Sequence, residues 1–596
     1  MKRTQFRIAG MVFALCLITV TGFLRIQTFT QKRGVAAEVR NQLSEKLQKL
    51  PPIPYEKTLG YKPSLKEVHL GRQLFNDPIL SRNNDVSCAT CHLTSHGFVD
   101  GNGLSVGSTG RGGPDGNTVG ASFGKGVLSV ERNCGDDGLG FNCDAFMFRN
   151  VLSTVNVGYR ANFVTNEGLL WDGRFGKLDF QVLLPIHTGE ELCGRNPVPS
   201  KTEDNPFRPG GPLFKKPILV QHSHAFNPYD GRDLALFNAQ PYTVEGVNSI
   251  RPDGSATIPS RVECVAIAIA KVRGVPQYRK LFKEAYGDEP SDLLIGRALA
   301  AFISTHVSKR TPYDAFVKGE NALSVRQMEG LAMFMSPRNQ EVRINNKVLR
   351  GAGCIECHAG PTFGGKGFAS LGVVSDQRSI LSRPKVVFDR NSFFAVFRTQ
   401  RGHYPRCHNS DFGISPTAEY APDIGRANAT TDEKDCFKFR VPPLRNVIET
   451  YPYFHHGTAR AQGIKSTRLE DRAIAALKQV VEYHLRGPVN SSVYARSNSG
   501  KQFFDPYFQL DPLVPVTYQS FAKDALGSDE QFPVKLSTEE VESLVDFIAY
   551  GLWDRESVSV GDMGNDVSHP KTVPSGFSPT ITRSDGTQLE LPPNFE

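Results

Sequence analysis

A pattern of two cysteines, separated by two residues and followed at once by a histidine, occurs twice in this 596-residue chain. Residues 88–92 read CATCH and residues 354–358 read CIECH. A CxxC pair alone is also typical of a redox dithiol or of half a zinc site. The adjacent histidine narrows the choice, because the thiols can form thioethers with haem vinyl groups while the imidazole binds the iron. The sequence therefore predicts two covalently attached c-type haems.

The spacing of the motifs indicates a duplicated domain. They begin at residues 88 and 354, too far apart for one small haem domain, and no clear repeat is visible outside them. With 39% hydrophobic residues, the chain is long enough for more than one core. We predict a mainly α protein with two cytochrome c-like haem domains. The expected boundaries are 66–315, with a loop-rich insertion at 194–260, and 316–560, with a second insertion at 376–435, before an extended tail at 561–596.

Helical patterns lie on both sides of each motif. Ala298 and Phe302 belong to one apolar face with a helical period. Ser537 and Glu540 form a capping signature before the last expected helix. Helices are expected at 64–75, 276–316, 324–335, 469–486 and 536–552.

The first 33 residues have the composition of a targeting segment. Basic residues at positions 2, 3 and 7 precede an apolar run, 8–24, which is near the shortest length that spans a membrane. No clear A-x-A cleavage site follows, so we favour an uncleaved inner-membrane anchor over a signal peptide. Residues 34–65 are expected to be a polar tether. Either reading places the body of the chain in a bacterial periplasm.

The formal charge of +8 does not indicate a nucleic-acid partner. Six of the basic residues lie in the first 33 residues, which contain no acid, so the remainder carries a net charge of only +2. Haem propionates would make this value more negative. No run of basic and aromatic residues has the pattern of a nucleic-acid interface, so we expect no such partner.

The cysteine count agrees with an oxidising compartment. Of 11 cysteines, one lies in the apolar run and four lie in the motifs, which leaves six. An even remainder in an exported protein predicts three disulfides, with free buried thiols as the alternative. The sequence does not fix the connectivity, and pairing of neighbours would give Cys134–Cys143, Cys193–Cys264 and Cys407–Cys436.

Longer segments around the motifs resemble bacterial diheme cytochrome c peroxidases and their MauG relatives. In the first half these are GRQLFNDPILSRNNDVSCATCH (71–92), FRNVLSTVNV (148–157), LLWDGRFGKLDFQVLLPIHTGEEL (169–192) and IGRALAAFISTHVS (295–308). In the second half they are GAGCIECHAGPTFGG, DIGRA (423–427) and FRVPPLRNVIETYPYFHHG (439–457). The segments follow the family's order and cover most of residues 60–555, apart from the insertions.

The resemblance implies that Cys88 and Cys91 attach the first haem and that His92 binds its iron. In many family members a later histidine blocks the opposite face of this haem until the enzyme is reduced. That position is Ser108 here, and no histidine occurs from residue 97 to residue 186. We therefore expect an open site, as in MauG, that binds peroxide or oxygen without activation.

The resemblance also places a catalytic carboxylate beside the first haem. The family's distal glutamate falls on Glu191, with the adjacent Glu190 as the alternative. A carboxylate there can move a proton from the inner to the outer oxygen of peroxide. Gln181 matches another position of the same distal region.

The second haem is expected to be attached to Cys354 and Cys357, with His358 on the iron. Family peroxidases usually add a methionine and MauG a tyrosine, but no methionine lies between residues 335 and 563. His484 falls at the family's ligand position, with Tyr483 as the alternative. A second imidazole should give this iron a lower potential than methionine would.

Other matched positions suggest supporting roles. Trp171 matches the tryptophan between the two haems, and Arg440 and Arg445 are candidate partners for haem propionates. Interdomain calcium ligands of the family match Asn150, Thr450 and Pro452, the last two through their carbonyl groups. His455 matches the histidine of the PYFHDG motif, whose aspartate is replaced here by His456.

Three functions follow from the resemblance. The first is a hydrogen peroxide reductase supplied with electrons by a small donor protein. The second is a MauG-like oxidase of an organic or protein substrate, which the missing distal histidine favours. The third is a rubber-oxygenase-like dioxygenase, which chain size suggests and Glu191 disfavours. We commit to the peroxidase class, which leaves open the donor, the substrate and whether the chain forms a homodimer.

Overall fold

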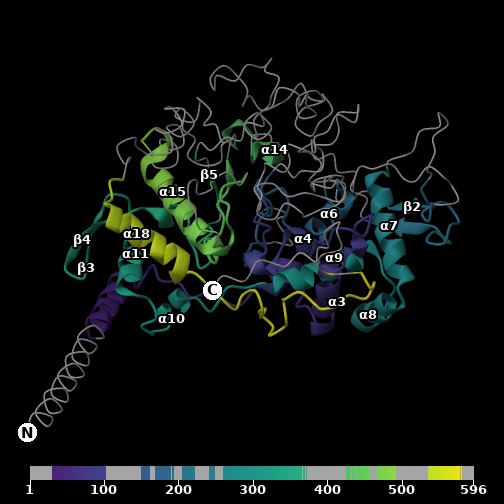
Figure 1. Cartoon of the computed structure of the whole chain (residues 1–596), viewed down its shortest axis with the longest axis horizontal. Coiled ribbons are helices and arrows are strands. Elements are labelled where there is room, and N and C mark those ends of the chain that lie inside the picture. The colour runs from purple at the N-terminus through teal and green to yellow at the C-terminus, as the bar shows by residue number, and fades with distance from the viewer. Residues whose placement is uncertain are drawn as a thin grey trace, which may run out of the picture.

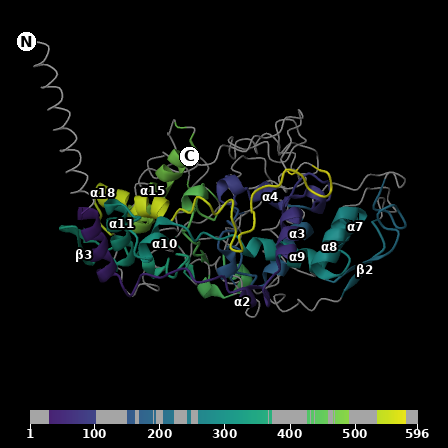
Figure 2. The same ribbon diagram turned by 90° about the horizontal axis from the view of Figure 1, so that it is seen from below.

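The computed structural model describes residues 30–101, 149–160, 168–188, 191–193, 205–221, 241–247, 259–365, 367–369, 371, 425–430, 432–435, 438–455, 457, 459, 466, 468–490, 534–577 and 579. Its helices form two groups that lie side by side in both views (Figures 1 and 2). One group surrounds α3 and α9, and the other surrounds α11 and α18. Each group has its own hydrophobic core, called here the first and the second core.

The main helices of each core are amphipathic or fully buried. The first core contains α3 (Leu65–Asn76), α7 (Arg261–Gly274), α8 (Pro276–Tyr286) and α9 (Asp292–Ser304). The second contains α10 (Pro312–Val317), α11 (Val325–Met335), α15 (Leu469–Asn490) and α18 (Thr538–Asp546), which continues as the π-helical turn η11 (Phe547–Gly551). Shorter α-helices are α2 (Tyr55–Leu59), α4 (Cys88–Cys91), α5 (Leu178–Gln181), α6 (Leu184–His187) and α14 (Ala427–Thr430). Short 3-10 helices are η1 (Pro78–Leu80), η2 (Thr94–His96), η4 (Val157–Tyr159), η6 (Cys354–Glu356), η8 (Glu433–Asp435) and η9 (Val447–Glu449).

The same helix crossing organises both cores. A Cβ added to Gly71 of α3 would lie 1.9 Å from the carbonyl oxygen of Ala298 in α9. A Cβ added to Gly330 of α11 would lie 2.1 Å from the carbonyl oxygen of Ser543 in α18. Because only glycine allows such backbone contact, the two crossings support a duplicated framework, although the sequence shows no clear repeat.

Serine caps explain where most of these helices begin. Ser64, Ser324 and Ser537 each accept a hydrogen bond from the backbone N–H three residues later, and the Glu or Gln at that position bonds back. This capping box satisfies two backbone donors that a helix start otherwise leaves without partners. The capping signature predicted for α18 is confirmed. The helix α7, which has the same box at Ser260, was not among the predicted helices.

The described strands form only three short antiparallel pairs. They are β1 (Ile218–Val220) with β2 (Tyr242–Val244), β3 (Glu341–Ile344) with β4 (Lys347–Arg350), and β5 (Phe368–Ala369) with β6 (Phe439–Arg440). The first pair lies within the predicted insertion at 194–260, and the described part of the chain is otherwise helical or irregular. The insertion at 376–435 lies largely outside the described residues.

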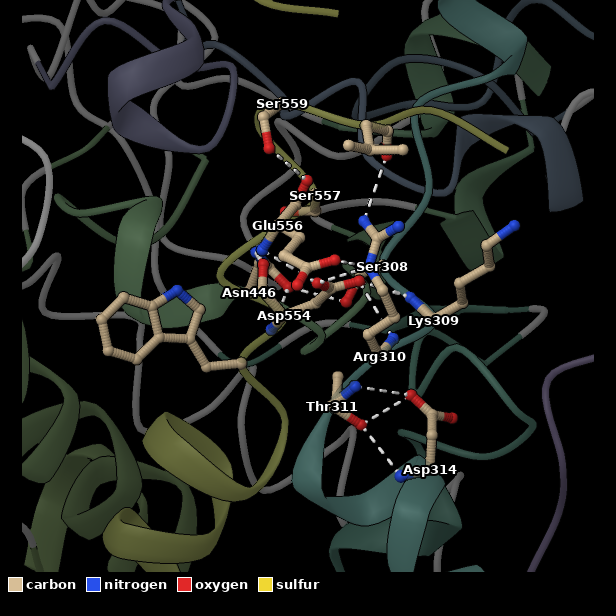
Figure 3. Close-up of polar contacts among 12 residues, drawn as sticks. Ser308, Lys309, Arg310, Thr311, Asp314, Asn446, Asp554, Glu556, Ser557 and Ser559 are labelled. Carbon is tan, nitrogen blue, oxygen red and sulfur yellow. Dashed lines mark hydrogen bonds and ion pairs between the residues drawn. The ribbon is translucent and has the colours of Figure 1, made fainter. Parts of the chain in front are cut away.

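The segment after the second core, residues 554–577, runs back along the first core, and we call it the strap (Figure 1). Figure 3 shows where it begins: Asp554 accepts hydrogen bonds from the backbone N–H groups of Lys309 and Arg310, at 2.8 and 3.0 Å. Further along, Asp566 forms an ion pair with Arg72 of α3, at 2.6 Å. The strap therefore joins the two cores through polar contacts that the predicted extended tail did not include.

The N-terminal predictions are tested only in part. Residues 30–42 are helical, and Val35, Val39 and Leu43 are buried in the second core. The prediction of a polar tether at 34–65 included neither this helix nor its burial. No helix among the described residues is long and apolar enough to cross a membrane. The apolar run at 8–24 lies outside those residues, so the anchor stays a prediction.

One predicted disulfide is present. Cys193 and Cys264 are bonded, with their Cα atoms 5.5 Å apart, and link the segment after α6 to α7. The other four cysteines of the predicted pairs, at positions 134, 143, 407 and 436, lie outside the described residues.

Candidate functional site: two CxxCH motifs

The first motif forms the short helix α4 and directs His92 into the first core. The Nδ1 atom of His92 donates to the carbonyl oxygen of Phe98, at 2.9 Å. This bond leaves Nε2 as the nitrogen available to a metal. Burial lowers the pKa of His92, so the ring is held in the neutral form that binds iron.

The second motif repeats this arrangement. Here Nδ1 of His358 donates to the carbonyl oxygen of Phe363, at 3.0 Å, and burial lowers the pKa of His358 to about 4. Phe98 and Phe363 also share a left-handed backbone, with φ of 63° and 56°. Such a conformation is unusual for phenylalanine, so its recurrence indicates a constraint that both sites impose.

The aromatic side chains behind the two motifs also correspond. Phe75, four residues after Gly71 of the first crossing, meets Phe302 edge-on, with ring centroids 5.3 Å apart. Phe334 meets Phe547 in the same way at 5.7 Å. Each histidine is thus placed by a helix crossing, an aromatic pair and a phenylalanine carbonyl.

A cavity of about 220 Å³ lies at the second motif. It is lined mainly by apolar atoms, with Cys354, Cys357 and His358 on one side and His484 of α15 on the other. The centroids of the two imidazole rings are 6.4 Å apart. A nitrogen–metal bond is about 2 Å long, so two imidazoles that bind one metal from opposite sides have centroids roughly 6 Å apart. The residues therefore fit a haem iron held between His358 and His484.

The ring of His484 is also oriented for this role. Its Nδ1 lies 2.7 Å from the carbonyl oxygen of Val480, one helical turn earlier. This contact leaves Nε2 as the candidate ligand atom. The neighbouring Tyr483 is fully buried, and its hydroxyl donates to the carbonyl oxygen of Leu371, at 2.9 Å. The geometry thus favours His484 over Tyr483.

Two guanidinium groups, that of the buried Arg440 and that of the half-buried Arg160, lie near this cavity. Arg440 lines it, and its Nε has no partner among the described residues. Burial lowers the pKa of Arg440 well below its usual value, and the nearby Arg160 lowers it further. Arg160 donates only to carbonyl oxygens, those of Gly168, Gly364 and Gly365, and within the described ranges neither arginine forms an ion pair. The two arginines therefore suit an anionic haem propionate. Arg160 was not among the predicted residues, because a single arginine has no sequence signature.

Arg445 also lines the cavity, but its guanidinium is already paired with a carboxylate. Its guanidinium forms a two-pronged ion pair with Asp314, at 2.7 and 2.8 Å, and its Nε donates to the carbonyl oxygen of Pro361. Its side chain is completely buried. Of the two arginines predicted to bind propionates, the geometry therefore favours Arg440 and gives Arg445 a structural role.

Trp171 and the predicted calcium ligands lie together. The indole Nε1 of Trp171 donates to the carbonyl oxygen of Asn150, at 2.8 Å, and Trp171 lines the second cavity. The side-chain amide nitrogen of Asn150 donates to the carbonyl oxygen of Pro452, at 2.7 Å, and Thr450 and Pro452 also line this cavity. His455 stacks on Phe439, whereas His456 lies outside the described residues. Asn150, which precedes Trp171 in the chain, thus contacts the second half of the protein directly.

In the described part of the distal region, Glu191 can be located relative to the first motif. The Cys88 thiol has its pKa raised to about 12, first by burial and then by the charge of Glu191, so that carboxylate lies close to the first motif. Gln181 lies at the end of α5. Glu190 and Ser108 lie outside the described residues, so their predicted roles stay predictions. No group of three or more His, Cys, Asp or Glu side chains that could hold a metal ion is found within the described part.

Two equivalent histidine-bearing CxxCH sites define the chain as a c-type cytochrome with two haem sites. A family model described as di-haem cytochrome c peroxidase matches residues 65–205 and 255–322. Cytochrome c551 peroxidase of Nitrosomonas europaea is 23% identical over 392 residues, which are 65% of this chain and 68% of that protein. The methylamine utilization protein MauG of Methylophilus methylotrophus is 24% identical over 314 residues, 52% of this chain and 58% of that protein. These matches identify the chain as an oxidoreductase similar to the di-haem cytochrome c peroxidases and to MauG.

Further similar proteins are found among curated sequences and solved structures. Cytochrome c peroxidase Ccp of Escherichia coli is 25% identical over 393 residues, which are 66% of this chain and half of that protein. A solved MauG-like protein associated with microbial copper homeostasis is 18% identical, with a TM-score of 0.45 over 88% of this chain and 97% of that one.

Proposed function

We propose that this protein is a periplasmic diheme peroxidase that reduces hydrogen peroxide at an open first haem. Electrons from a donor protein would enter through the second haem. The observation that carries the proposal is an asymmetry: His358 faces His484 at 6.4 Å, whereas no imidazole faces His92 in this way among the described residues. A site with two protein ligands suits electron transfer, and a site with one leaves room for peroxide.

The haems supply electron storage and an iron that binds peroxide, and the chain supplies the surroundings. Glu191 lies near the first motif and can transfer the proton that cleavage of the O–O bond requires. Arg160 and Arg440 hold positive charge near the second haem. Trp171 lines the second cavity while its segment packs in the first half, so it lies where electrons would cross.

The proposal includes a calcium ion and an export route. Neutral oxygen atoms from Asn150, Thr450 and Pro452 would bind the ion, which would fasten the two halves beside Trp171. The apolar run at 8–24 would anchor the protein in the inner membrane. The Cys193–Cys264 disulfide supports an oxidising compartment.

A MauG-like oxidase is the second candidate. The absence of histidine from residue 97 to residue 186 favours it, because an open ferric site can react without prior reduction. Such an enzyme would store two oxidising equivalents and oxidise an organic or protein substrate instead of a cytochrome.

The test is stopped-flow absorbance of the haem-loaded ferric protein mixed with stoichiometric hydrogen peroxide. A fast spectral change without prior reduction, at least tenfold slower in Glu191→Gln, supports the proposal. The exposed Glu542→Gln serves as the matched control and should react normally. Decay of the signal with a reduced cytochrome indicates a peroxidase, and persistence for minutes indicates an oxidase. No reaction until one haem is reduced would contradict the open site.

A further inference from the structure

The chain turns after α9 through a buried polar segment, Ser304 to Ser308, that contains His306. The His306 side chain is fully buried. Its Nδ1 lies 2.7 Å from the hydroxyl of Thr154, and its Nε2 has no partner among the described residues. Burial lowers the pKa of His306 to about 3, with a smaller contribution from His92, so the ring is neutral at any working pH.

Three phenylalanines fix the plane of this ring. His306 stacks on Phe98, with centroids 4.1 Å apart and an angle of 22° between the planes. Phe302 and Phe75 meet it edge-on, at 4.6 and 5.9 Å. With Thr154 holding one ring nitrogen, the imidazole cannot rotate without losing a hydrogen bond and a stacking contact.

The stacked partner is the residue that orients the first haem ligand. Phe98 has a left-handed backbone, and its carbonyl oxygen accepts the hydrogen bond from Nδ1 of His92. A phenylalanine keeps this backbone conformation only where its surroundings enforce it. His306 provides a flat surface against one face of the Phe98 ring, and Ser153 donates to the carbonyl oxygen of Gly97, next to Phe98.

The second site has the same carbonyl, but no histidine stacks on Phe363 among the described residues. Phe363 is surrounded by Tyr313, Phe334 and Phe547, which meet it edge-on at 4.9, 5.6 and 6.2 Å. A ring stacked in parallel on the phenylalanine is therefore a feature of the first site alone within the described residues. The two sites share a framework and differ at this contact.

We propose that His306 is a positioning residue for the first haem ligand: it holds Phe98 so that its carbonyl keeps the hydrogen bond from His92. The bond gives the His92 imidazole more electron density, which stabilises ferric iron and lowers the reduction potential of the first haem. The inference rests on the proposed function only in that His92 binds the first iron. Peroxide reactivity itself is not required for it.

The experiment is a spectroelectrochemical titration of both haems in the haem-loaded unchanged protein and in four variants. His306→Leu removes the stacked ring, His306→Phe keeps a flat ring, and Thr154→Val removes the hydrogen bond to Nδ1. The control Tyr278→Phe removes a buried hydrogen bond to Asp77 in the same core.

We expect His306→Leu to raise the potential of the first haem, to leave that of the second unchanged, and to slow peroxide turnover about tenfold. Thr154→Val should shift the same potential by less. His306→Phe, which keeps the flat ring but lacks the bond to Thr154, should restore most of the potential, to about that of Thr154→Val. Tyr278→Phe should leave it unchanged. An unchanged first-haem potential in His306→Leu, or in Thr154→Val if His306→Leu does not fold, would overturn the proposal. A shifted potential in a protein that never reacts with peroxide would keep this inference and reject the proposed function.

Discussion

The imidazole rings of His358 and His484 face each other across the second cavity with their centroids 6.4 Å apart, although 126 positions separate them in the sequence. We predict that both bind the second haem iron. His484→Met should raise the reduction potential of this haem, because a thioether ligand favours ferrous iron. Potentiometry of the haem-loaded variant tests this, and Tyr483→Phe is the control that should leave the potential unchanged. A potential that changes in Tyr483→Phe but not in His484→Met would make Tyr483 the ligand.

Arg440 provides a second test of the same site. We predict that Arg440→Met lowers the potential of the second haem, because loss of a buried positive charge stabilises the more positively charged ferric state. The same potentiometric titration measures the shift. Replacement of Arg343, an exposed residue of β3, serves as the control. A potential equal to that of the unchanged protein would show that Arg440 does not interact with a propionate.

Replacement of Arg445 should affect stability instead of potential, because its guanidinium forms an ion pair with Asp314. Removing one member of a buried ion pair leaves an uncompensated charge and typically costs 3–5 kcal/mol. We therefore predict that Arg445→Met lowers the free energy of unfolding by about 3–5 kcal/mol, measured by chemical denaturation, with little change in either haem potential. Adding Asp314→Leu should recover most of the loss, since no charge is then left alone.

The sequence was most informative where chemistry or periodicity is local. The CxxCH motifs, the helix at 324–335 and the cap at Ser537 are local patterns, and the structure contains each of them. His484 could be placed only through the family resemblance, because its partner is remote in sequence. Arg160 and His306 were missed for a related reason: what distinguishes them is burial beside residues from distant segments, which no single-sequence pattern encodes. The strap was predicted only as an extended tail, because its polar residues bind partners that are distant in sequence, Arg72 and Asp77 of the first core.

The strap also supplies the last prediction, which concerns pH. His569 is half-buried, its Nδ1 donates to the side-chain oxygen of Asn76 at 2.6 Å, and desolvation, with a smaller contribution from Arg72, lowers its pKa from 6.5 to about 4. Below pH 6.5 the unfolded chain binds a proton at this histidine that the folded chain does not, so stability falls as pH drops from 6.5 towards 4. The loss should reach roughly 3 kcal/mol at pH 4. Chemical denaturation over this range measures it.

His569→Gln, which carries no titrating group, should flatten this part of the pH profile, whereas His69→Gln, at an exposed position of α3, should leave it unchanged. Hydrogen exchange followed by mass spectrometry should show residues 562–577 losing protection first as the pH falls. Because Asp562 of the strap also bonds Tyr55 and Lys309, release of this segment should loosen the contact between the two cores before either core unfolds. A profile that keeps its slope in His569→Gln would assign the acid sensitivity to another group.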